Sequence, residues 1–211
     1  MKKSVLSASA ALAATLLASP AFAETKTYQL TDFTRVSAAT GVAVDVVVGG
    51  DYAVSATSSA EGLERLEITV ANGELQVRRR NKGLRWRRGD EVSVAVRMPA
   101  LDGVDVSSGA SVDATGVDAG AFAIDVSSGG SLDVAGRCDA LTVDVSSGGS
   151  VDADTLLCRS ANASASSGGS ADIFASESVN GDASSGGSVD VSGSPKSVAK
   201  DTSSGGSVDV D

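Results

Sequence analysis

The sequence predicts an all-β protein: a right-handed parallel β-helix, or β-solenoid, with a β-hairpin-rich region capping its N-terminal end. Three observations carry this prediction. A Ser-Ser-Gly-Gly-Ser block recurs at nearly constant spacing, polar and apolar residues alternate around each block, and the chain holds 24 glycines but only 3% aromatic residues. The composition rules out a large aromatic core and favours a narrow interior packed by small side chains.

Residues 1–23 are expected to be a secretory signal peptide. Lys2 and Lys3 precede an uncharged apolar run, and Ser19-Pro20-Ala21-Phe22-Ala23 offers the small residues that a cleavage site after Ala23 requires. The run is shorter than the roughly 20 residues of a membrane span, and no transmembrane segment is predicted in the mature chain. We therefore expect an exported protein of the periplasm or the outer cell surface.

Residues 24–100 are expected to form a β-rich region that caps the solenoid. We expect a strand over 41–48 that turns at Gly49-Gly50-Asp51 and returns over 52–57, followed by one helical turn over 60–66. A second hairpin is expected around Asn72-Gly73, the strongest short-range hairpin signal. A strand over 92–96 completes the region.

Residues 101–211 hold six copies of the block, the first in the form Ser-Ser-Gly-Ala-Ser. The copies are 18 to 20 residues apart and begin at Ser107, Ser127, Ser146, Ser166, Ser184 and Ser203. Two residues before each copy stand Asp105, Asp125, Asp144, Ser164, Asp182 and Asp201, and an Asp follows each copy at Asp113, Asp133, Asp152, Asp172, Asp190 and Asp209.

A repeat of about 19 residues matches one rung of a β-helix. It is too short for a β-α-β crossover, and its period-two alternation is typical of strands. A disordered Ser/Gly tail is the alternative, but such tails lack a regular apolar frame. Two interior columns are predicted, one of Val106, Val126, Val145, Ala165 and Ala183, and another of Phe122, Leu141, Ala161, Val179 and Val198.

The two cysteines are expected to form a disulfide bond. Cys138 and Cys158 each lie eight residues before a serine block, so they occupy the same position on successive rungs. Rungs are about 4.8 Å apart, which is within the range that a disulfide bridges. Export places both thiols in an oxidising compartment. Two reduced, buried cysteines are the alternative.

The order of these segments resembles the putative auto-transporter adhesin head GIN domain family. The resemblance rests on 41–49, on 70–77 around Asn72-Gly73, on 92–101, and on the serine rungs that follow. It implies a right-handed β-solenoid, export and an adhesin-like role. The family offers no catalytic residues to carry over.

No catalytic residues are predicted. The chain has no histidine, so Ser-His nucleophilic catalysis and His-ligated zinc are excluded. Paired carboxylates can hydrolyse glycosides, and a carbohydrate-active β-helix enzyme acting on acidic polysaccharide is the alternative function. Trp86 is the only tryptophan available as a sugar platform.

The aspartates of the repeat are expected to form ladders along the solenoid. Rows of hard oxygen ligands suit Ca²⁺, so weak calcium binding is considered, with no other cofactor, at Asp105, Asp125, Asp144, Asp113, Asp133 and Asp152. The alternative, which we favour, is that exposed charges keep a flat, repetitive strand stack from pairing with other chains.

A strongly basic segment interrupts this acidic chain, whose formal net charge is −10. It is expected to be a protruding hairpin loop that binds an anionic ligand through Arg78, Arg79, Arg80, Lys82, Arg85, Trp86, Arg87 and Arg88. Anionic glycan, lipopolysaccharide or an anionic lipid surface are the partners considered, and a loop neutralised by the acidic rungs is the alternative. Nucleic acid is not expected, because the rest of the chain repels phosphates.

The sequence therefore predicts a non-catalytic, exported, adhesin-like module of the cell envelope. In this interpretation the solenoid is a spacer and the basic segment makes the contact.

Overall fold

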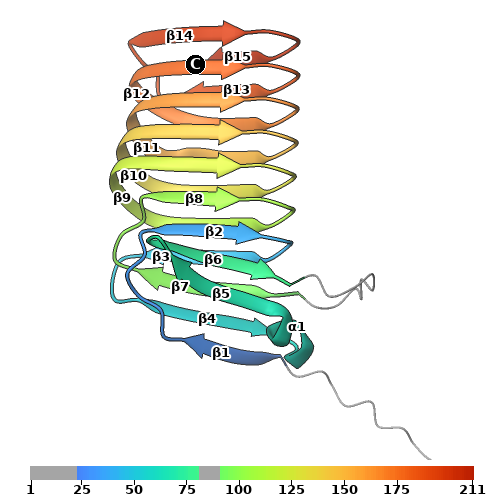
Figure 1. Ribbon diagram of the computed structural model, residues 1–211. Coiled ribbons are helices and arrows are strands. Elements are labelled where there is room, and N and C mark those ends of the chain that lie inside the picture. Colours follow the sequence, from blue (N-terminus) through green and yellow to red (C-terminus); the bar gives the residue numbers. More distant parts are fainter. Residues whose placement is uncertain (1–22, 81–90) are drawn as a thin grey trace, which may run out of the picture.

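The computed structural model describes residues 23–80 and 91–211, and the fold is a parallel β-solenoid, as predicted (Figure 1). In this part of the chain fifteen strands and one short helix occur, and the strands belong to one continuous hydrogen-bonded network. The chain winds upward in a right-handed sense, with each turn stacked on the one before (Figure 1). The expected signal peptide lies almost wholly outside the described residues.

Each rung has two strands that meet at a serine turn. Face A carries the strands that enter the turns, and face B carries the strands that leave them. The strands that belong to one face are β2 (Arg35–Ala39), β6 (Glu74–Arg79), β8 (Gly103–Val106) and β14 (Ser197–Thr202) on face A, and β3 (Ala43–Val48), β7 (Ser93–Met98), β13 (Ser188–Ser192) and β15 (Ser207–Val210) on face B. Four long strands contribute to both faces because they bend at the opposite edge, and these are β9 (Ser111–Val126), β10 (Ser131–Val145), β11 (Ser150–Ala165) and β12 (Ser170–Ala183).

The interior columns follow from the parallel register. Val106 pairs with Val126, Val126 with Val145, and the column continues through Ala165 to Ala183, all buried as predicted. One rung alone buries no apolar surface, but stacked rungs share a continuous core. The second predicted column is also buried from Phe122 to Val179. Its last member, Val198, is 44% exposed, because no described strand covers the rung that contains it.

The serine turns need both serine and glycine for their backbone geometry. In the second copy, Ser128 and Gly129 both have left-handed backbone angles, with φ values of 52° and 72°. The Gly129 amide donates to the Ser147 carbonyl of the next turn at 3.2 Å, so the turns are hydrogen-bonded to each other along the edge. A Cβ on Gly149 would lie 2.8 Å from the Val126 carbonyl oxygen. Glycine therefore allows successive turns to approach closely.

The parallel stack begins before the first serine block. β2 and β3 form a rung whose turn contains Thr40 and Gly41 in the same left-handed geometry as Ser128 and Gly129. This rung lies between β8–β9 on one side and the rung made by β6 and β7 on the other. The antiparallel strands β1 (Glu24–Tyr28), β4 (Ala53–Ser58) and β5 (Leu66–Ala71) then close this end of the stack.

Two predicted hairpins in this region are not formed. β3 and β4 do not form a hairpin, because β7 inserts between them and pairs with both. β6 and β7 do not flank a hairpin loop either, because β6 pairs with β2 and β5 on face A while β7 pairs with β3 and β4 on face B. The hairpin at Asn72-Gly73 and the short helix α1 (Ala60–Arg65) are confirmed.

The predicted disulfide bond joins β10 to β11. Cys138 and Cys158 are register partners with a Cα–Cα distance of 4.5 Å, and both are buried. The bond closes a loop with a sequence separation of 20. On the chain-entropy model such a bond stabilises the fold by about 3 kcal/mol.

Candidate binding surfaces

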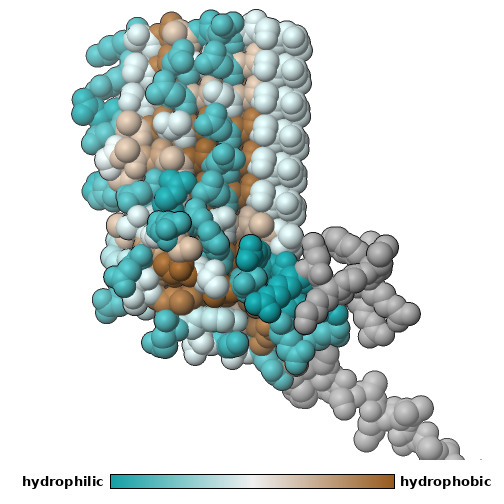
Figure 2. All heavy atoms as spheres, viewed as in Figure 1, coloured by the Kyte–Doolittle hydropathy of each residue, from teal (hydrophilic) through white to brown (hydrophobic). Residues whose placement is uncertain are grey.

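The basic segment replaces a serine turn. It leaves face A at the end of β6 and enters face B at β7, so residues 80–92 connect the two faces where the neighbouring rungs have turns of a few residues. Thr40, in the turn of the adjacent rung, contacts Arg79, the last residue of β6 before this connection. Its hydroxyl accepts a hydrogen bond from the Arg79 amide at 2.8 Å. The connection therefore begins at the serine-turn edge, which is the regular pale column in Figure 2.

Two of the arginines share one carboxylate. The Glu67 carboxylate on β5 accepts from Nε of Arg78 at 3.2 Å and from Nε of Arg80 at 3.3 Å. These hydrogen bonds, first that of Arg80 and then that of Arg78, lower the pKa of Glu67. The guanidinium of Arg79 has no ion-pair partner among the described residues. Glu67 thus neutralises only part of the positive charge at this corner.

The remaining members of the predicted anionic-ligand site lie outside the described residues. They are Lys82, Arg85, Trp86, Arg87 and Arg88.

The predicted aspartate ladders are formed, one on each face. The face B ladder runs in unbroken register through Asp45, Asp113, Asp133, Asp152, Asp172, Asp190 and Asp209. The face A ladder contains Asp105, Asp125, Asp144, Ser164, Asp182 and Asp201. Sequence reasoning missed Asp45, although the alternating Val44-Asp45-Val46 carries the same signal as the later rungs.

Stacking raises the pKa of several ladder carboxyls. Partial burial raises the pKa of Asp133, and the neighbouring charges of Asp152 and Asp113 raise it further. Asp125 and Asp172 are shifted in the same direction, again by burial first and then by their ladder neighbours. These three ladder aspartates therefore stand among like charges that repel them.

The six aspartates considered for calcium do not converge on one point. Asp105, Asp125 and Asp144 lie on face A, while Asp113, Asp133 and Asp152 lie on face B. Asp105 is also engaged by Arg35, whose Nη2 lies 3.0 Å from its carboxylate. In the part of the chain that the structure describes, no group of three or more acidic or cysteine side chains is arranged to hold a metal ion.

A shallow depression collects carboxylates near the C-terminal end of face B. It has a volume of about 250 Å³, and its aspartates are Asp152, Asp154, Asp172, Asp190 and Asp211. It continues the face B ladder and adds Asp154 and Asp211, which lie outside the ladder register.

The family described as "Putative auto-transporter adhesin, head GIN domain" matches residues 32–195. The chain belongs to this family. The match covers the rungs from β2 to β13 and includes the connection between β6 and β7. The resemblance inferred from the sequence is thus confirmed. No curated protein matches this GIN-domain chain significantly.

Solved structures show the same fold at low sequence identity. The crystal structure of a putative adhesin from Bacteroides fragilis covers 90% of this chain and 97% of its own, with 16% identity and a TM-score of 0.71. A putative adhesin from Parabacteroides merdae covers 90% and 96%, with 13% identity and a TM-score of 0.51. Family membership and the disulfide bond together indicate an extracytoplasmic, adhesin-like GIN-domain protein. Among the described residues, no helix has the length and apolar character needed to cross a membrane.

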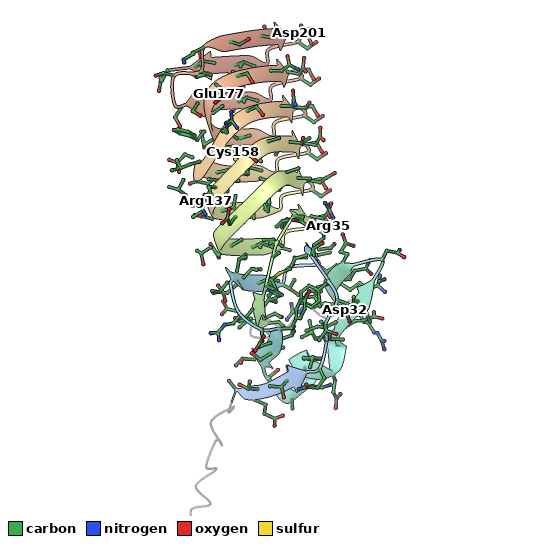
Figure 3. All side chains as sticks on the ribbon, turned by 90° about the vertical axis from the view of Figure 1, so that its left-hand side faces the viewer. Asp32, Arg35, Arg137, Cys158, Glu177 and Asp201 are labelled. Atoms are coloured by element: carbon green, nitrogen blue, oxygen red, sulfur yellow. A yellow bond between two sulfur atoms is a disulfide. The ribbon has the colours of Figure 1, made fainter. Side chains whose placement is uncertain are left out.

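Sequence reasoning also missed a row of ion pairs along the edge where β9 to β12 bend. Arg137 donates two hydrogen bonds to Asp118 on the previous rung, and Arg159 donates two to Glu177 on the next. Figure 3 labels Arg137 and Glu177 on this edge, on rungs near Cys158. The signal was available, since Arg137 and Arg159 stand beside the two cysteines. They join charged neighbours across rungs instead of offering an open binding site.

Proposed function

We propose that this protein is a non-catalytic adhesin-like module of the bacterial cell envelope. It contacts anionic glycan, lipopolysaccharide or lipid through its basic corner, which is the segment from Arg78 to Arg88. One observation carries the proposal: the chain interrupts a regular series of short turns with a basic connection at one rung. Most of the other rungs carry an aspartate on each face, and these aspartates repel anionic surfaces. Attachment to such a surface therefore has one favourable place, at the N-terminal end of the stack.

The chemistry of this corner suits phosphate and carboxylate groups. Its cations are mostly arginines, and the planar guanidinium can pair with two oxygens of one phosphate or carboxylate. Trp86 in the same segment adds a side chain that is common at membrane–water interfaces. Exposed contacts of this kind are screened by salt.

Co-sedimentation with lipopolysaccharide or anionic vesicles tests the proposal. Replacing Arg85, Arg87 and Arg88 together with Ser is expected to abolish sedimentation at low ionic strength without changing the melting temperature. A matched variant replaces Arg137, Arg159 and Lys196 with Ser, which removes the same charge from rungs further along the stack. This variant is expected to bind like the wild type, and raising the salt is expected to release the wild type.

The outcomes separate the alternatives. Unchanged binding by the Arg85, Arg87 and Arg88 variant would remove the basic corner from the mechanism. New reducing or unsaturated ends after incubation with an acidic polysaccharide would instead indicate the carbohydrate-active enzyme, which no finding so far favours.

A further inference from the structure

The last rung of the solenoid places polar residues at two interior positions, Thr202, which pairs with Ala183, and Lys200, and only Lys200 is charged. On face A, Ile124, Val143, Ala163 and Gly181 stack in register and are buried. The next member of this column is Lys200 on β14, which pairs with Gly181. A lysine thus occupies a position that every earlier serine-block rung gives to an apolar residue or glycine.

Lys200 reaches across the open end of the core. Its Nζ donates a hydrogen bond of 3.1 Å to the carbonyl oxygen of Val208, which belongs to β15 on the opposite face. The aliphatic part of a lysine can cover apolar surface while its ammonium group stays in water. Lys200 therefore links the two faces of the terminal rung above the core.

Gly181 and Val208 make room for this arrangement. A Cβ on Gly181 would lie 2.8 Å from Cγ1 of Val208. Val208, only 7% exposed, therefore fills the interior space that a larger residue at 181 would take. Together Val208 and Lys200 of the last rung and Gly181 of the rung before it form a closure over the end of the core.

The terminal rung is otherwise suited to pair with another β edge. β14 pairs only with β12 and β15 only with β13 among the described strands, so each has one free edge. Val198 is 44% exposed in the adjacent interior column. Free, flat strand edges with apolar side chains are where β-proteins associate, and inward-pointing charges, above all lysines, oppose this.

We propose that Lys200 is an end-stop that prevents the last rung from pairing with the last rung of a second copy of this chain. The ammonium would have to be buried between the two cores, at a high desolvation cost. The other end of the stack is closed by the antiparallel strands β1, β4 and β5. Association through the C-terminal end alone is a contact of one surface with itself, so it stops at a two-fold dimer.

Replacement of Lys200 by Val tests the end-stop. Light scattering on the full mature chain is expected to give the monomer mass for the wild type and twice that mass for Lys200→Val at tens of micromolar. The matched variant Lys196→Val removes a lysine four residues away that lies outside the strand, and it is expected to remain monomeric. Adding Val198→Lys to Lys200→Val restores a charge in the neighbouring column and is expected to restore the monomer.

Two results would overturn the proposal: a wild type that is already dimeric through this end, or a folded Lys200→Val that stays monomeric. Should Lys200→Val fail to fold, as shown by circular dichroism, Lys200→Met retains the long side chain without its charge. The same doubling of mass is expected of it, and a monomeric Lys200→Met would count equally against the end-stop.

Discussion

At the scale of single residues, the alternation of apolar and polar residues along a strand decides which side chains are buried. Adjacent side chains therefore point to opposite sides, one into the core and one into solvent. Val145 is 2% exposed within its column, whereas Asp144 points outward in the face A ladder. Val145→Asp would bury a charge without a partner and is expected to lower the free energy of unfolding by about 3 kcal/mol or more. Asp144→Val is expected to change it by about 0.5 kcal/mol or less while increasing aggregation. Urea denaturation of both variants measures the difference, and equal effects would refute the inside–outside assignment.

The same scale shows how far sequence reasoning reaches. The buried columns from Val106 to Ala183 and the Cys138–Cys158 bond were predictable, because period-two alternation and constant spacing fix which residues meet. Val198 has the same local pattern, yet it is exposed, because burial in a solenoid depends on a further rung above. The sequence alone did not show that Lys200 continues an interior column, because this follows only from the register of β14 with Gly181.

At the scale of elements, local turns were predictable and strand order was not. The Asn72-Gly73 hairpin was predicted correctly, since its geometry is set by two residues. β3 and β4 are close in sequence, but β7, some 40 residues further on, separates them. Parallel stacking of rungs outweighs the tendency of neighbouring strands to pair, because it continues the buried columns from β9 into β3 and β7. The basic segment was therefore predicted to be a hairpin loop, whereas it stands where the other rungs have a serine turn.

The aspartate ladders give a pH-dependent prediction at this scale. The raised pKa of Asp133 means that folding favours its protonated form. The stabilisation that this gives the folded protein is complete below the pKa of Asp133 in the unfolded chain, near 3.8. It is lost as the pH rises through the higher pKa of Asp133 in the folded protein. Asp133→Asn is expected to stabilise the protein at pH 7 by about 0.5 kcal/mol, as expected for removing like charges from paired strands. The gain is expected to vanish at pH 3.

Asp118→Asn is the matched control for this measurement. The hydrogen bonds from Arg137 lower the pKa of Asp118. The charged form of Asp118 therefore stabilises the folded protein above the pKa that Asp118 has in the unfolded chain. This stabilisation is lost as the pH falls through the lower pKa of Asp118 in the folded protein. At pH 7 this variant is expected to destabilise, opposite in sign to Asp133→Asn. Thermal melts at pH 7 and pH 3 distinguish the two. A destabilising Asp133→Asn at pH 7 would show that ladder repulsion is unimportant.

At the scale of the whole molecule, the solenoid is a column of like charges with a basic corner near one end. Both ladders run nearly the full length of the stack, with rungs about 4.8 Å apart. The neighbouring charges repel by roughly 1 kcal/mol per pair at the dielectric constant of water. Such a column of like charges repels anionic surfaces along its length, which favours the proposed contact at the N-terminal basic corner.

This charge distribution predicts how the stability of the whole molecule responds to ions. Counterions gather along a row of charges without needing a coordination site, so NaCl is expected to raise the melting temperature progressively. Because the described aspartates do not converge into a metal-binding group, Ca²⁺ and Mg²⁺ at equal ionic strength are expected to act alike. Differential scanning fluorimetry across NaCl, MgCl₂ and CaCl₂ titrations makes the comparison. A rise that is specific to Ca²⁺ and saturates would show a real calcium site, and Asp172→Asn and Asp125→Asn would then tell which face holds it.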